Sequence, residues 1–264
     1  MEELNYEKIA VFGGVYNNYL ALDALVTDAK NRGTEKLFCL GDLGAFGPNP
    51  DKVFPILLEH NIAVVQGNYD HAIGHNLSDC QCGYTDARDN YFAQISYDYT
   101  VSKTSPEFKT QQKQLPPEIR FNFGGKRVLL CHGSPRKTNE FLWESTTPTH
   151  FLQKLFQDYK ADIILATHTG IHWKREVAEG KFFANVGVIG RPENDGETNV
   201  WYAILSANRH VEIEFIRMEY DYQRLAKEMK EEILPQEFID TILTGWWTTC
   251  LEILPAKERM QGKF

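Results

Sequence analysis

Short apolar segments alternate with amphipathic ones along the first part of the chain. The apolar segments at residues 8–12, 37–40 and 62–66 predict buried strands. Between the first two, the spacing of apolar positions predicts one face of a helix that Asn17 or Asn18 can cap, and this face consists of Leu20, Leu22, Leu25 and Val26. A Pro-Asp pair begins a second predicted helix at residues 50–60. Strands and helices in this alternation predict βαβ units and a parallel sheet.

The pattern changes at residue 71 and again at residue 118. Residues 71–117 are polar and aromatic, with predicted helices at 87–101 and 106–115, and we interpret them as a cap-like insertion over the site. A hairpin at 119–123 and 126–131, a helix at 149–159 and a strand at 163–166 follow. Four further strands, predicted to be antiparallel, cover 173–178, 181–186, 199–206 and 210–218. Helices at 222–233 and 236–243 belong to a C-terminal helical tail, about 220–264, whose Trp246-Trp247 pair should pack against the body.

These elements predict a single α/β domain over residues 1–264, with two packed sheets and helices on both outer faces. The composition, 42% hydrophobic and 24% charged, is ordinary for a globular protein. A net charge of −8 argues against a general binder of nucleic acids or anionic membranes. We find no segment resembling a signal peptide or membrane span, and five cysteines do not suggest a disulfide framework. We therefore expect a cytoplasmic protein.

Polar side chains follow four of the predicted strands where each strand ends. They are Asp42, Asn68, His132 and His168. Each alone has an ordinary explanation, since Asn and Asp form turns and a lone His is usually structural. Four at strand ends on one edge of a sheet predict a metal site, because a mixed oxygen and nitrogen set suits Mn²⁺, Fe²⁺ or Zn²⁺. Cys80 and Cys82 lack the second pair that a zinc site needs, and we interpret them as structural.

At these residues the chain resembles the calcineurin-like metallophosphoesterase family, from Ile9 to about Met218. The motifs that carry the resemblance are Gly41-Asp42, Gly67-Asn68-Tyr69-Asp70, His132-Gly133-Ser134-Pro135-Arg136, Thr167-His168 and Asn185-Val186-Gly187. The resemblance implies a four-layer αββα sandwich of two mixed sheets and a two-metal centre that hydrolyses phosphoric esters. It further implies that Asp42 bridges both metals, while Asn68, His132 and His168 complete one of the two sites.

The chain departs from the family pattern at three ligands. Gly14-Val15-Tyr16 stands where the family has Asp-x-His, and Thr167-His168-Thr169-Gly170 stands where it has Gly-His-x-His. Tyr69 also replaces a His of the third motif. All three missing ligands belong to one metal site, so we expect one divalent metal rather than two. Substitute ligands could come from Tyr16, His71, His75 or His172, although packing or surface roles are the stronger expectation for each.

The resulting prediction is a metal-dependent phosphoric ester hydrolase, a phosphatase or phosphodiesterase acting on a small phosphoester or nucleotide. Its catalytic residues would be Asp42, Asn68, His132 and Arg136. Arg136 is included as a contact for the phosphate, because a guanidinium matches phosphoryl oxygens. A surface ion pair is the alternative role for Arg136. Two other classes remain open: a degenerate metal- or phosphate-binding sensor, and a mononuclear metal enzyme with chemistry unrelated to phosphate.

Overall fold

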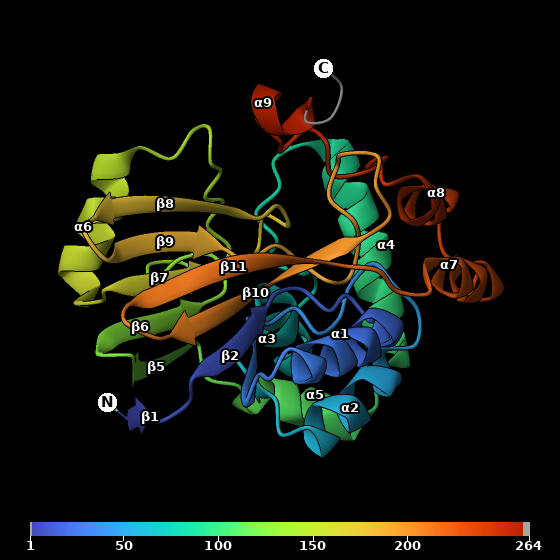
Figure 1. Ribbon diagram of the computed structural model, residues 1–264. Coiled ribbons are helices and arrows are strands. Elements are labelled where there is room, and N and C mark those ends of the chain that lie inside the picture. The colour runs from blue at the N-terminus through green and yellow to red at the C-terminus, as the bar shows by residue number, and fades with distance from the viewer. Residues whose placement is uncertain (1, 261–264) are drawn as a thin grey trace.

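A computed structural model describes residues 2–260 and contains two β-sheets that lie face to face (Figure 1). The six-stranded sheet has the order β1-β5-β6-β7-β9-β8, with strands Glu2–Leu4, Glu118–Phe123, Lys126–Cys131, Ile163–Ala166, Lys181–Asn185 and Trp173–Ala178. The five-stranded sheet has the order β11-β10-β2-β3-β4, with strands Val211–Met218, Val200–Ala207, Lys8–Phe12, Lys36–Cys39 and Ala63–Val64. Both sheets are mixed: β6, β7 and β9 run parallel, as do β2, β3 and β4, whereas β5, β8 and β10 pair antiparallel with β6, β9 and β2. The edge strands β1 and β11 pair with β5 in parallel and with β10 in antiparallel orientation.

The two sheets pack together because each presents an apolar inner face. Alternate residues of the central strands point inward, so Ile9 and Val11 of β2 meet Val128 and Leu130 of β6 in one buried cluster. Phe38 and Phe121 stack across the interface with ring centroids 5.1 Å apart. This cluster forms the central core between the sheets.

The outward-facing residues of the same strands bury against helices. The five-stranded sheet is covered by α1 (Tyr19–Asn31) and by α2 (Val53–Glu59), which follows a 3₁₀ turn at Pro50–Lys52. The six-stranded sheet is covered by α6 (Thr149–Tyr159). Figure 1 shows these helices on opposite sides of the paired sheets. The expected αββα sandwich of two mixed sheets is confirmed.

The remaining helices are α3 (Asn68–Gly74), α4 (Ala87–Lys103), α5 (Pro106–Gln114), α7 (Tyr222–Glu231) and α8 (Gln236–Thr244), with a short α9 (Ala256–Arg259) in the tail. Helices α3, α4, α7 and α8 contribute to one apolar cluster at the end of the sandwich where the parallel strands terminate, and Figure 1 shows α4, α7 and α8 at the right. Helix α5 packs beside α2. Phe92 of α4 and Phe238 of α8 pack against Phe46 and Tyr69 beside the strand ends. Trp247 is 4% exposed, as expected for a tail that packs on the body.

Several local features differ from the sequence interpretation. Strand β1, helix α3 and helix α9 were not predicted, and β4 is only two residues long. Cys80 and Cys82 form a disulfide bond with each other, which the sequence interpretation did not anticipate. Within residues 2–260, every helix is too short or too polar to cross a lipid bilayer.

Candidate metal centre

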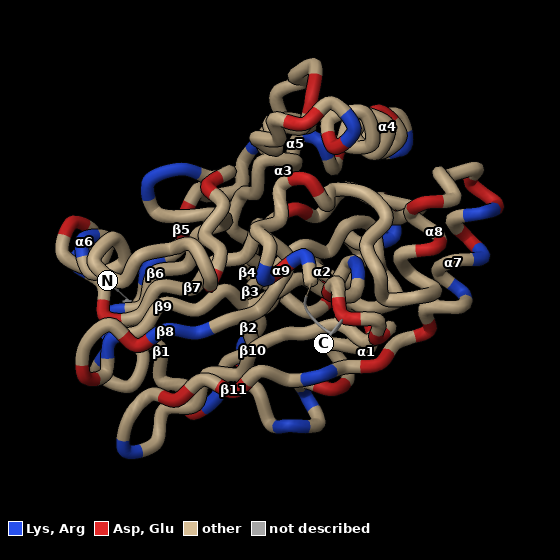
Figure 2. The backbone as a smooth tube through the Cα atoms, turned by 90° about the horizontal axis from the view of Figure 1, so that it is seen from above, with Lys and Arg blue, Asp and Glu red and all other residues tan. Residues whose placement is uncertain are grey.

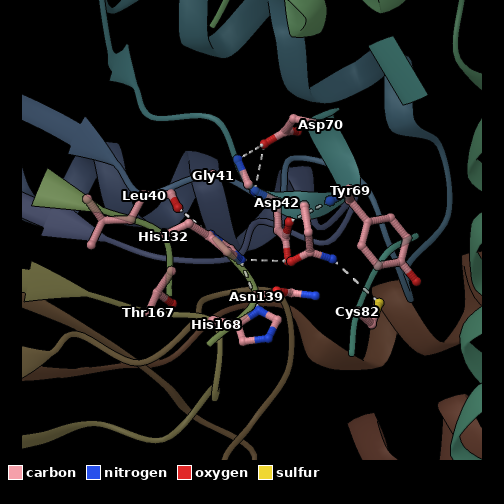
Figure 3. Close-up of polar contacts among 12 residues, drawn as sticks. Leu40, Gly41, Asp42, Tyr69, Asp70, Cys82, His132, Asn139, Thr167 and His168 are labelled. Carbon is pink, nitrogen blue, oxygen red and sulfur yellow. Dashed lines mark hydrogen bonds and ion pairs between the residues drawn. The ribbon is translucent and has the colours of Figure 1, made fainter. Parts of the chain in front are cut away.

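The four predicted ligands come from both sheets and meet at the same end of the sandwich. Asp42 and Asn68 follow β3 and β4 of one sheet, whereas His132 and His168 follow β6 and β7 of the other. The expectation of a single sheet edge was therefore wrong, because facing sheets, and not neighbouring strands alone, bring these side chains together. The ligand atoms of Asp42, His132 and His168 all lie within 4.8 Å of one another (Figure 3).

The loop that carries Asp42 is fixed by the buried carboxylate of Asp70 (Figure 3). Oδ2 of Asp70 accepts hydrogen bonds from the backbone N–H groups of Asp42 at 2.8 Å and Gly67 at 2.9 Å, and Oδ1 accepts one from Leu43 at 3.0 Å. A Cβ on Gly41 would lie 2.3 Å from the nitrogen of Gly67, so only glycine allows this close approach. The loops with Gly41-Asp42 and Gly67-Asn68 are thus held against each other by Asp70 and by the close backbone contact at Gly41.

The hydrogen bonds of His132 determine which of its ring nitrogens faces the cluster. Nδ1 lies 2.6 Å from the carbonyl oxygen of Leu40, which can only accept, so Nδ1 carries the proton. Nε2 then presents a lone pair 3.2 Å from Oδ2 of Asp42 and 3.2 Å from Nδ1 of His168. A backbone carbonyl behind one imidazole nitrogen and a metal in front of the other is the usual arrangement of a metal-binding histidine.

Asn68 and His168 each leave a buried polar atom without a partner. The amide nitrogen of Asn68 donates to the carbonyl oxygen of Cys80 at 2.8 Å, which leaves Oδ1 buried and unbonded. Nε2 of His168 is also buried and unbonded. Burial, and secondarily the neighbouring His132, lower the pKa of His168 to about 3, so its imidazole is neutral as metal binding requires. Buried polar atoms without partners are costly, and a cation beside Asp42 would satisfy Oδ1 of Asn68. His168 turns Nδ1, and not Nε2, toward His132, so Nδ1 is its candidate ligand atom.

The electrostatics of the cluster also favour a cation. Burial, followed by the Asp42 carboxylate, raises the pKa of Asp70 to about 6, although backbone N–H groups oppose the shift. Burial lowers the pKa of His132, but the Asp42 carboxylate and its hydrogen bond outweigh it, so the net pKa of His132 is raised. The shift shows that the negative charge of Asp42 stabilises positive charge at this position. One carboxylate oxygen, one amide oxygen and two imidazoles fit a divalent transition metal.

The positions of the three missing ligands are packed against side chains. The ring of Tyr16 fills the space beside Gly14 and Gly190, so that a Cβ on Gly14 would lie 2.7 Å from Tyr16 Cε1 and from Val188 Cγ1. A Cβ on Gly170 would meet the indole of Trp247 at 3.5 Å. Burial raises the pKa of Tyr16 well above its usual value, and Arg191 offsets only part of this, so the phenol stays neutral.

The other candidate residues lie in separate interactions. Nδ1 of His172 lies 2.8 Å from Oε1 of Glu193, and the rings of His71 and His75 contact each other at a centroid distance of 4.3 Å. The Arg136 guanidinium donates to Glu140 at 2.7 Å and does not line the pocket at the cluster, so the surface ion pair is the arrangement observed. Instead, the pocket is lined by Arg191, which the sequence interpretation did not single out.

Restoring the three missing ligands tests whether they alone separate this chain from a two-metal centre. Gly14→Asp, Tyr16→His and Gly170→His should raise the metal content from one toward two per chain and speed hydrolysis of a generic phosphodiester roughly tenfold. Val188→Ala is added because the Gly14 Cβ would collide with Val188. Elemental analysis and initial rates give the result, with Val188→Ala alone as the control. A variant that melts cooperatively yet binds one metal and gains no activity would refute this interpretation.

Two mixed sheets flanked by helices, with a carboxylate and two imidazoles converging at one end of the sandwich, define an α/β fold with a candidate metal centre. The chain belongs to the calcineurin-like phosphoesterase superfamily, whose domain model matches residues 8–210. The resemblance found in the sequence motifs is thereby confirmed.

Other proteins resemble this chain in sequence or in fold. An uncharacterized protein, MJ0912, from Methanocaldococcus jannaschii is 28% identical over 251 residues, which cover 90% of this chain and 98% of that protein. The crystal structure of hypothetical protein PH1004 from Pyrococcus horikoshii superposes with a TM-score of 0.75 at 22% identity, covering 91% of this chain and 99% of the other. A metallophosphoesterase from Sphaerobacter thermophilus gives a TM-score of 0.69 at 24% identity, covering 91% and 100%. At 22% and 24% identity, these two structures show a similar fold and nothing more.

Proposed function

We propose that this chain is a metal-dependent phosphoric ester hydrolase that works with a single divalent transition metal, Mn²⁺, Fe²⁺ or Zn²⁺. The metal would be held by Asp42, Asn68, His132 and His168, and the substrate would be a small phosphomonoester, phosphodiester or nucleotide. Membership of a phosphoesterase superfamily supports the reaction class. A cytoplasmic location is part of the same proposal.

One observation carries the proposal: the hydrogen bonds that hold His132 and Asn68 in place leave a lone pair on the other polar atom of each side chain. His132 uses Nδ1 on Leu40, and Asn68 uses its amide nitrogen on Cys80, so one lone pair of each remains for a cation. The packing of Tyr16 against Gly14, and of Trp247 against Gly170, supports one metal instead of two, since these side chains fill the space at the positions of the lost ligands.

The chain's own residues would perform two tasks around the metal. A divalent cation at this site would act as a Lewis acid on a phosphoryl oxygen and lower the pKa of a water. Asp70 would hold the Asp42 loop in position through its three backbone hydrogen bonds. The aromatic walls of the pocket, which include Phe46 and Phe92, would exclude bulk water from the reacting group.

The direct test is a panel of phosphomonoesters, phosphodiesters and nucleotides assayed with and without added metal. We expect weak hydrolysis of at least one ester, abolished by a chelator and restored by Mn²⁺, Fe²⁺ or Zn²⁺. Metal bound at one equivalent with no hydrolysis across the panel would favour a sensor or binding protein. Hydrolysis that resists the chelator would exclude the proposed metal chemistry.

A further inference from the structure

Arg191 is a buried cation for which residues 2–260 supply no counter-ion. Arg191 is only 7% exposed, and its Nε has no hydrogen-bond partner. None of the described carboxylates forms an ion pair with its guanidinium. The guanidinium instead stacks over the indole of Trp247, 3.6 Å from the ring centroid, with the rings of Tyr16 and Phe46 at 5.9 and 5.6 Å. Cation–π contacts recover part of the cost of desolvation, but a buried charge normally has an anionic partner.

Arg191 lines the same pocket as the candidate metal ligands. Asp42, Asn68 and His168 form one part of the lining, and Arg191 with Tyr16 forms another. The cavity measures about 50 Å³. Since roughly 10–15 Å³ on this measure holds one water, the space suits a group of a few heavy atoms without rearrangement.

The loop that carries Arg191 is held by the C-terminal tail. The indole N–H of Trp247 donates to the carbonyl oxygen of Pro192 at 2.8 Å, and the backbone N–H of Trp247 donates to Oδ1 of Asn194 at 3.0 Å. The guanidinium is thus positioned before any ligand arrives, which reduces the entropy lost on binding.

The other ionisable groups around Arg191 do not neutralise it. Tyr16, Tyr84 and Cys250 face the pocket, and burial raises the pKa of both Tyr16 and Tyr84, which keeps these phenols neutral. The carboxylate in the lining, Asp42, is committed to the N–H of Tyr69 and to His132. With a divalent metal bound beside Asp42, the pocket would carry an excess of positive charge facing a small cavity.

We propose that Arg191 binds the phosphoryl group of the substrate inside this pocket, next to the metal centre. A guanidinium offers several N–H donors in a plane that matches two phosphoryl oxygens. Tyr16 occupies a position where the family has a ligand of the second metal, and the guanidinium of Arg191 lies over the Tyr16 ring. Arg191 therefore supplies positive charge on the side of the pocket where the second metal is missing. The identity of the anion as substrate rests on the proposed function, whereas anion binding by Arg191 does not.

Inorganic phosphate is the probe, titrated calorimetrically into the full chain as purified and after loading with Mn²⁺. Arg191→Met should weaken phosphate binding by about 10- to 100-fold with unchanged metal content, and Arg191→Lys should fall in between because it keeps the charge without the fork. Phosphate should raise the melting temperature of the natural protein and leave that of Arg191→Met unchanged. The matched control is Arg209→Met, an exposed arginine that should bind phosphate like the natural protein.

Phosphate binding by Arg191→Met at the natural affinity, or no phosphate binding by the natural protein at millimolar concentration, would overturn the inference. If Arg191→Met does not fold, the phosphate affinity of Arg191→Lys is the test, and an affinity equal to that of the natural protein would overturn the inference. Loss of binding in Arg191→Met, together with no hydrolysis of any ester by the natural protein, would support the anion site and refute the proposed function. Hydrolysis by the natural protein with a kcat/KM that Arg191→Met leaves unchanged would support the proposed function and refute substrate binding by Arg191.

Discussion

Replacing His132 with alanine should remove the bound metal and with it at least 99% of any phosphoesterase activity, a fall of about 100-fold or more. His132 supplies a nitrogen whose lone pair is directed at Asp42 and His168, and no other described side chain takes its place at 3.2 Å. Lewis-acid stabilisation contributes several kcal/mol, and each ~1.4 kcal/mol corresponds to one factor of ten. His168→Ala should have the same effect, because it too removes a nitrogen donor from the cluster. Metal content and initial rates are measured side by side.

His150→Ala is the matched control for both variants, since His150 lies exposed on α6, away from the cluster. It should keep natural metal content and rate. Activity that survives both His132→Ala and His168→Ala would indicate a contaminating phosphatase or a different site, and the account of the metal centre would fail.

Asp70→Ala should lower the free energy of unfolding of the metal-loaded protein by about 2–4 kcal/mol. The change leaves three buried backbone N–H groups, those of Asp42, Leu43 and Gly67, without their acceptor, at a cost of about 1–3 kcal/mol each. Removing the carboxylate also relieves the cost of burying it beside Asp42, which its raised pKa reflects, and this offsets part of the loss. For a chain of this size the melting temperature should fall on the order of 10 °C.

Asp70→Asn separates the charge from the hydrogen bonds, because it keeps one acceptor oxygen in the same shape. Its loss of stability should be smaller than that of Asp70→Ala. Asp23, exposed on α1, provides the matched control Asp23→Ala, which should be near neutral. A melting temperature for Asp70→Ala equal to that of the control would show that the two loops do not depend on this carboxylate.

The strands that position the metal ligands were predictable because each is a short apolar run that ends in a glycine or a polar residue. Asp42 and His132 could be placed at strand ends on this basis. Which strands share a sheet was not predictable, since pairing of β6 with β7 and of β3 with β4 depends on long-range contacts. Strand β1 was missed for a related reason: Glu2–Leu4 has no apolar alternation and forms a strand only by pairing with β5.

The importance of Arg191 was hidden from sequence analysis for a physical reason. It lies in an irregular loop after β9, and its burial comes from Trp247 of the C-terminal tail, far along the chain. Arginine is usually exposed, so a loop position gives no local indication of burial. Arg136 followed a recognisable motif, but its neighbour Glu140 lies four residues further on and pairs with it. The charge distribution in Figure 2, with Lys and Arg interspersed among Asp and Glu, likewise gives no indication of an internal cation.

The most direct test of a single working metal is a titration of the metal-free protein with Mn²⁺ while the rate of phosphoester hydrolysis is followed. The ligand set of Asp42, Asn68, His132 and His168 predicts that activity rises linearly and reaches its maximum at one bound equivalent. An activity that appears only as a second equivalent binds, or a protein that takes up no metal, would contradict the account.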